Sequence, residues 1–156
     1  MKLKAGLASA IAFAVCLSPS GMAEKAKEKT TEAPLSEVNI TGEWTFQANT
    51  GPECTFSGNA LISATDKPTR YVCELTAVQV CPTSTWQVRQ SCAATRLGDE
   101  VIIASKIEEY IQGKANNGYK PDNFKLTIKS PDLMKGVLVS WGFHNAEFRR
   151  LEGAVS

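Results

Sequence analysis

The stretch that decides the fold is CTFSGNALISATDKPTRYVCELTAVQVCPTSTWQVRQSC, residues 54–92, which holds four of the five cysteines. Apolar and polar residues alternate along it, and its runs of Thr, Val, Ile and aromatic residues are interrupted at 66–69 and at 82–83. Alternation with a period of two is typical of a strand with one buried face. The stretch therefore predicts three antiparallel strands joined by two short turns.

The two turns set the four cysteines opposite each other in pairs. A hairpin turning at 66–69 places Cys54 against Cys81, and a tight turn at 82–83 places Cys73 against Cys92. The same registers put a mostly apolar set on the cysteine face: Phe56, Ala60, Ile62, Tyr71, Leu75, Ala77, Trp86 and Val88. The opposite face carries Thr55, Ser57, Asn59, Glu74 and Arg89. The cysteine pattern and the apolar pattern thus agree on one buried face.

Directly opposed residues of antiparallel strands lie near the separation that a disulfide needs, so we predict the bridges Cys54–Cys81 and Cys73–Cys92. Pairing Cys73 with Cys81 would join two residues of one strand unless that strand bends, and the third connectivity needs both turns displaced. The cysteine spacings do not suit zinc, and the only histidine is the distant His144. We therefore expect disulfides, no metal and no cofactor.

Short strand-like runs continue from Val38 to the end of the chain. Because most connections are short, we expect an all-β fold of eight strands that pair consecutively as an up-and-down meander. The predicted strands are 42–48, 54–64, 70–80, 85–95, 100–108, 123–130, 134–141 and 145–151. Residues 109–122 (EYIQGKANNGYKPD) are rich in Gly, Asn and Pro and predict a long loop.

The N-terminus has the form of a secretory signal peptide. Lys2 and Lys4 precede an apolar run at 5–17, which is too short to span a bilayer, and small residues lead up to a cleavage site near Ala23. We expect 1–23 to be removed, 24–37 to form a flexible charged leader and 38–153 to form the barrel domain. Such a protein would be periplasmic or secreted, where disulfides persist.

Charge excludes some partners. Without Lys2 and Lys4, 15 basic residues remain against 16 acidic ones, a formal balance of −1. This balance predicts no binding to nucleic acid and none to an anionic membrane surface.

Gly42 and Trp44 open the first predicted strand, and Arg149 and Arg150 end the last. This arrangement resembles the calycin superfamily of lipocalin-like barrels, in which a Gly-x-Trp and an Arg or Lys near the end of the last strand pack together. The resemblance implies an eight-stranded barrel closed at one end by Gly42, Trp44 and one of the two arginines. A guanidinium stacked on Trp44 would be a cation–π contact.

The small bacterial metalloprotease inhibitors of that superfamily also resemble this chain, since they carry a Gly-x-Trp followed about ten residues later by a Cys, where Cys54 stands. They act through an N-terminal segment, a part that residues 24–37 would play here. This chain departs from them in its four cysteines and its greater length.

No catalytic constellation emerges from the sequence. His144 falls in the predicted turn 142–145, where a surface histidine is expected, and no acid–base pair of carboxylates stands out. An eight-stranded barrel either fills with side chains or holds one small ligand. The predicted inward residues that would contact such a ligand are Trp44, Phe56, Tyr71, Trp86 and Gln90. Gln90 is a buried amide that needs hydrogen-bond partners.

We therefore expect a non-catalytic binding protein. The first hypothesis is a carrier of a small apolar or amphipathic ligand. The alternatives are an inhibitor of an exported protease that acts through its leader, and a protein-interaction module of the bacterial envelope.

Overall fold

The computed structural model describes residues 35–115 and 118–151, which form eight β-strands and one 3-10 turn. The predicted signal peptide and most of the predicted leader lie outside the described residues. The elements in chain order are η1 (Leu35–Glu37), β1 (Gly42–Ala48), β2 (Thr55–Ala64), β3 (Arg70–Cys81), β4 (Ser84–Leu97), β5 (Glu100–Gln112), β6 (Asn123–Ser130), β7 (Leu133–Val139) and β8 (Phe143–Arg150).

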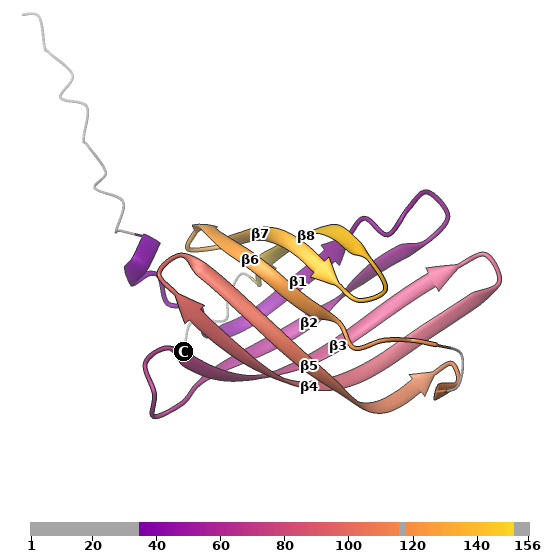
Figure 1. Ribbon diagram of the computed structural model, residues 1–156, viewed down its shortest axis with the longest axis horizontal. Coiled ribbons are helices and arrows are strands. Elements are labelled where there is room, and N and C mark those ends of the chain that lie inside the picture. Colours follow the sequence, from indigo (N-terminus) through magenta and orange to yellow (C-terminus); the bar gives the residue numbers. More distant parts are fainter. Residues whose placement is uncertain (1–34, 116–117, 152–156) are drawn as a thin grey trace, which may run out of the picture. The chain divides into compact units, whose positions relative to one another are not determined.

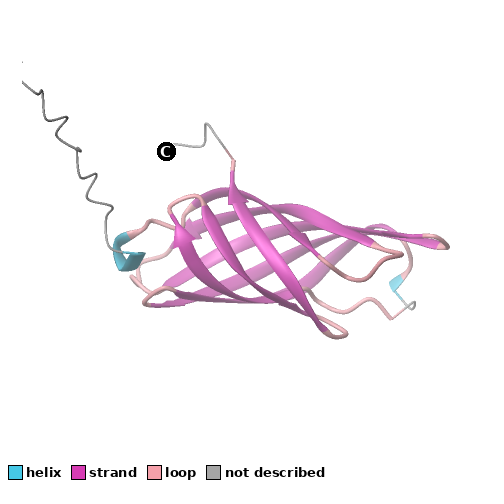
Figure 2. Cartoon of the chain, turned by 90° about the horizontal axis from the view of Figure 1, so that it is seen from above, coloured by secondary structure: helices cyan, strands magenta, loops and turns pink. Residues whose placement is uncertain are grey.

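The strands form a closed antiparallel barrel in the order β1 to β8, with each strand hydrogen-bonded to the next (Figures 1 and 2). The barrel closes where β8 pairs with β1, with Phe148 opposite Phe46. The predicted eight-stranded meander is confirmed. Closure gives each of the eight strands two neighbours, which is one way a small β protein limits the sheet edge that could pair with other chains.

The predicted registers of the β2–β3 and β3–β4 hairpins are confirmed. β3 pairs with β4 so that Cys73 faces Cys92, and the β2–β3 register, with Thr55 opposite Val80, brings Cys54 beside Cys81. Both predicted disulfides form, with Cα–Cα distances of 4.3 Å for Cys54–Cys81 and 4.8 Å for Cys73–Cys92. Disulfides of this kind are typical of proteins in oxidising compartments. Burial alternates along β2 as the sequence pattern predicted.

Four predicted boundaries are wrong by two residues or more, and the first is the end of β4, which runs to Leu97 and not to residue 95. β5 runs to Gln112, so residues 109–112 are strand and not loop, because the long β4 offers backbone partners as far as Gln87. The register shifts twice along this part of the β4–β5 pair. β7 ends at Val139 and β8 begins at Phe143, since Val139 pairs with Phe143 across a turn at 140–142. The predicted strand 134–141 was therefore too long and the predicted strand 145–151 began too late.

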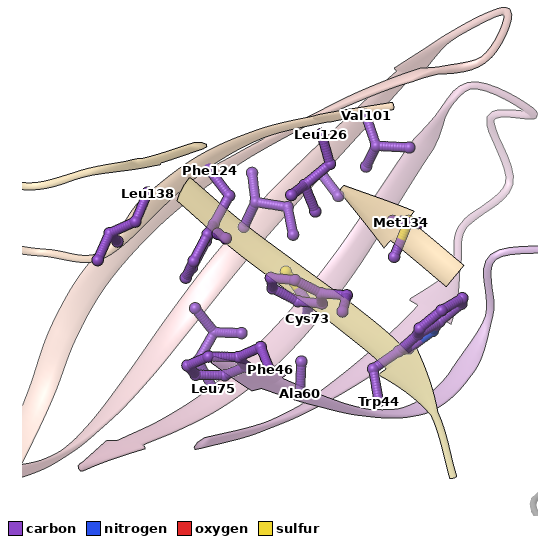
Figure 3. Close-up of a cluster of buried hydrophobic side chains, with 14 of the residues drawn as sticks. Trp44, Phe46, Ala60, Cys73, Leu75, Val101, Phe124, Leu126, Met134 and Leu138 are labelled. Carbon is purple, nitrogen blue, oxygen red and sulfur yellow. The ribbon is translucent and has the colours of Figure 1, made fainter. Parts of the chain in front are cut away.

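The barrel interior is packed with side chains through its middle. Phe46 lies 5.1 Å from Phe148, 5.4 Å from Phe124 and 5.8 Å from Phe56 between ring centroids. Gly58 makes room for this cluster, because a Cβ at that position would lie 2.4 Å from the Phe46 ring. Figure 3 shows Trp44 and Leu138 at opposite sides of the cluster, with Phe46 between them.

Candidate ligand pocket

The two ends of the barrel are built differently. We name as the closed end the segment 35–41 together with the turns at 65–69, 98–99 and 131–132. The open end consists of the connections 49–54, 82–83, 113–122 and 140–142. In Figure 1 the closed end is on the left, beside η1.

Trp44 and Arg150 seal the closed end. The guanidinium carbon of Arg150 lies 4.4 Å from the centroid of the fully buried Trp44 ring. Arg150 also donates hydrogen bonds to the carbonyl oxygens of Thr41, at 2.6 Å, and Asn39, at 2.5 Å, while Trp44 Nε1 donates to Ile40 O at 3.0 Å. Of the two arginines considered, Arg150 therefore makes the contact with Trp44, and Arg149 points outward.

Gly42 belongs to the same end and has a φ of 113°, a backbone conformation that favours glycine. The structure thus brings together the residues that the resemblance named for barrel closure.

A second arginine, Arg96, was missed by sequence reasoning. Its buried guanidinium donates to three backbone carbonyls, those of Val38, of Leu35 at 2.6 Å and of Gly98 at 2.8 Å. These bonds hold the end of the predicted leader, where η1 forms, across the closed end. The alternation along β4 could have predicted its burial, since Arg96 continues the series of inward-facing positions in that strand.

The open end contains a pocket of about 400 Å³, a size in the range of small-molecule sites. It is lined by aromatic and aliphatic side chains, by the Cys54–Cys81 disulfide and by a few polar groups. The lining residues, which we call the open-end pocket, are Thr50, Cys54, Phe56, Gln79, Cys81, Ser84, Trp86, Asp122, Leu138, Ser140, Trp141, Gly142 and His144.

The five predicted ligand residues do not lie together. Phe56 and Trp86 line the open-end pocket. Trp44 is sealed beneath Arg150 at the closed end, and Tyr71, near the turn at 65–69, donates its hydroxyl to Pro68 O at 3.3 Å. Gln90 is fully buried, but its amide is already hydrogen-bonded within the protein. The alternating pattern identified inward residues without telling which end of the barrel each one occupies.

The partner of Gln90 is Asp122. Gln90 Nε2 donates to Asp122 Oδ2 at 2.6 Å, and the Asp122 backbone N–H donates to Gln90 Oε1 at 3.0 Å. The hydroxyl of the buried Tyr119 donates to the same Oδ2 at 2.7 Å. Burial raises the pKa of Asp122 to about 6, although the hydrogen bonds from Tyr119 and Gln90 act in the opposite direction. Burial and the neighbouring Asp122 charge raise the pKa of Tyr119 above its ordinary value.

The strand pairing explains why Asp122 is inside. β6 pairs with β5 only over Glu100–Ile103, so the second half of β5 lacks β6 as a partner. The segment before β6 lies there instead: Ser105 donates from Oγ to Asp122 O at 2.6 Å and from its backbone N–H to Asn123 Oδ1 at 2.8 Å. Part of the predicted 109–122 loop therefore supplies a buried carboxyl to the pocket.

Two further pocket residues were misplaced by the sequence reasoning. His144 is the second residue of β8, half-buried and facing the pocket, and not part of a surface turn as predicted. Trp141, in the turn at 140–142, is 60% exposed and contributes to the pocket lining. Since the strand ends on both sides of this turn were predicted two residues too late, neither residue could be placed.

Trp86 is covered on one side by Gly113, because a Cβ there would lie 2.4 Å from Trp86 Cδ1. The buried Trp86 Nε1 has no hydrogen-bond partner among the described residues. No group of three or more His, Cys, Asp or Glu side chains suited to a metal ion occurs within 35–115 and 118–151. In the same ranges, no helix has the length and apolarity needed to cross a membrane.

Comparison with known proteins bears on the fold alone. No known protein family and no curated protein matches the sequence. Among solved structures, the chain is similar to a redesigned β-barrel, with a TM-score of 0.52 and 14% identity over 78% of this chain and 98% of that chain. It is also similar to a de novo designed fluorescence-activating β-barrel, with a TM-score of 0.51 and 16% identity over 76% of this chain and 99% of that one. The chain thus has the fold of a small antiparallel β-barrel.

Proposed function

We propose that this protein is an exported, non-catalytic carrier that holds a small apolar or amphipathic ligand in the open-end pocket of a lipocalin-like barrel. The observation that carries the proposal is the pocket of about 400 Å³ at one end of a barrel whose middle and opposite end are packed. Sites for small ligands are concave and mostly apolar, with a few polar groups that orient the ligand. Asp122, Gln79 and His144 are such groups here.

Two features support export. The signal-peptide pattern at 1–23 predicts cleavage near Ala23 and a periplasmic or secreted protein. The two disulfides fit an oxidising compartment. The Trp44–Arg150 contact at the closed end supports the relation to the calycin superfamily.

Native mass spectrometry tests the carrier function. The mature protein, purified from its own host, is weighed before and after denaturing extraction. We expect an additional small-molecule mass that is lost on unfolding, and a start of the mature chain near residue 24. A bare native mass in repeated preparations would contradict the proposal.

A truncation separates this function from protease inhibition through the leader. Removing residues 24–34 spares Leu35, whose carbonyl is bonded to Arg96, so the closed end keeps its described contacts. The carrier function predicts that the truncated protein retains its bound mass. Inhibition of an exported protease that is lost on this truncation would favour the leader as the functional segment instead.

A further inference from the structure

The open-end pocket contains a carboxylate without a cationic partner, a feature that bears on the class of ligand and rests on the proposed function. Asp122 is 1% exposed and, among residues 35–115 and 118–151, is the only acidic residue that lines the pocket. No lysine or arginine lines it in the part of the chain that the structure describes, and His144 is the one basic residue that does. An isolated buried charge is costly unless it is paired.

The hydrogen bonds to Asp122 do not neutralise it. The Gln90 amide and the Tyr119 hydroxyl are neutral donors, and both bind the same atom, Oδ2. Oδ1 makes neither of these bonds. Although burial raises the pKa of Asp122 to about 6, the carboxyl is mainly ionised at neutral pH. One oxygen of the charged carboxylate is therefore left outside these two bonds, and Asp122 is among the residues that line the pocket.

The remainder of the lining suits the apolar part of a ligand and the flanks of a cation. Phe56, Leu138 and the Cys54–Cys81 disulfide provide an apolar wall. Trp86 and Trp141 add two indole rings, whose faces attract ammonium groups more strongly than other aromatic side chains do. A carboxylate and indole rings in one small pocket are complementary to an amine that carries a hydrocarbon body.

We propose that the ligand is an amphipathic cation, a protonated amine whose ammonium group donates to Asp122 Oδ1 while its apolar body packs against Phe56 and Trp86. The ligand supplies the positive charge that the pocket lacks. An alcohol of the same length shares the hydrogen-bond donor but not the charge, and a carboxylate of the same length has the wrong charge.

Three probes with one eight-carbon chain separate these cases. Binding of octylammonium, 1-octanol and octanoate to the mature protein is measured by isothermal titration calorimetry near pH 7.5, below the concentrations at which the probes aggregate. We expect octylammonium to bind about tenfold more tightly than 1-octanol, and octanoate to bind most weakly.

Two variants locate the charge. Asp122→Asn retains an oxygen for Gln90 and Tyr119 but removes the negative charge, so it should lose the preference for octylammonium and keep its affinity for 1-octanol. Asp99→Asn makes the same chemical change in an exposed turn at the closed end and should behave like the unmodified protein. Thermal unfolding of both variants checks that they are folded.

The outcomes distinguish this inference from the function on which it rests. If 1-octanol and octanoate bind as tightly as octylammonium, or if folded Asp122→Asn keeps the preference, the pocket binds apolar ligands and the cation proposal is wrong. If none of the three probes binds, the carrier function is contradicted as well.

Discussion

The closed end and the open end of this barrel treat their buried polar groups in opposite ways. At the closed end, Trp44 Nε1 and the guanidinium groups of Arg96 and Arg150 all donate to backbone carbonyls. At the open end, Asp122 retains an oxygen outside its hydrogen bonds to Gln90 and Tyr119, and Trp86 Nε1 has no partner among the described residues. Satisfied groups stabilise a fold, whereas unsatisfied ones lower its stability.

The difference suggests a division of roles along the barrel axis. In this division, the closed end and the packed middle provide most of the free energy of unfolding. The open end contributes less, because it contains the pocket and polar groups that the described residues leave without full hydrogen bonding. Natural binding sites often show this trade of stability for function. Substitutions at the two ends test whether stability and ligand binding are divided in this way.

Trp44→Ala should have the largest effect on stability. The substitution empties a fully buried site and removes the ring on which Arg150 stacks, so we expect a loss of about 3–5 kcal/mol in the free energy of unfolding. Urea denaturation measures the loss. Trp86→Ala is the matched control, and it should cost less because that ring borders the pocket and its Nε1 has no hydrogen-bond partner in the described part of the chain. Equal losses at both positions would argue against the division.

Asp122→Asn should stabilise the protein, and only at higher pH. The pKa of Asp122 is raised from 3.8 to about 6, so ionisation of the buried carboxyl costs about 3 kcal/mol at pH 7, and the cost shrinks through pH 4 and disappears below about pH 3, where the carboxyl is protonated in both the folded and the unfolded state. The unmodified protein should therefore gain stability from this group as the pH falls from 7 to 4.

Denaturation at pH 7 and at pH 4 tests the prediction for Asp122. The variant should be the more stable protein at pH 7, and the two should differ little at pH 4. A variant that is less stable at both pH values would mean that the carboxyl is a structural group and not a destabilised one.

Arg96→Met should have an intermediate effect. The methionine keeps the apolar part of the side chain but leaves the carbonyls of Val38, Leu35 and Gly98 without their donor, for an expected loss of about 1–3 kcal/mol. Arg70→Met is the matched control, because the exposed Arg70 side chain donates to the Thr95 hydroxyl and to no backbone carbonyl of the described residues. Indistinguishable unfolding curves for the two variants would show that Arg96 does not secure the closed end.

Trp141→Ser should change stability least. The side chain is 60% exposed, so its replacement should alter the free energy of unfolding by less than about 0.5 kcal/mol. Because Trp141 lines the pocket, calorimetry should still detect a severalfold loss of affinity for 1-octanol. If the affinity for 1-octanol did not change, the ligand would not contact Trp141 and would lie deeper in the open-end pocket.

Much of the fold was predictable from the sequence because two independent patterns coincided. The alternation along 54–92 and the four cysteines select the same face of the sheet. A register shift of one residue in the β2–β3 or β3–β4 pair would have moved the paired cysteines out of opposition. The choice of Arg150 over Arg149 was not predictable from the motif alone. It follows from the inward-facing side of β8, which depends on the β1–β8 register.

The site was less predictable because it is assembled by contacts between distant residues. Asp122 enters the barrel beside the part of β5 that does not pair with β6. No local sequence pattern predicts that the β5–β6 pairing is so short. Gln90 was correctly predicted to be buried and to need hydrogen-bond partners, but its partner Asp122 lies 32 residues away in the sequence. Position along the barrel axis, which separates Trp44 from Trp86, also requires the complete topology.

The three tryptophans can report directly whether a ligand binds at the open end. A heteronuclear NMR titration with 1-octanol follows the indole N–H resonances of Trp44, Trp86 and Trp141, and 1-octanol is chosen because its binding does not depend on the charge of Asp122. We expect saturable shifts for Trp86 and Trp141 and none for Trp44, which is sealed beneath Arg150. A shift of Trp44 alone, or no shift at any of the three, would contradict the assignment of binding to the open end.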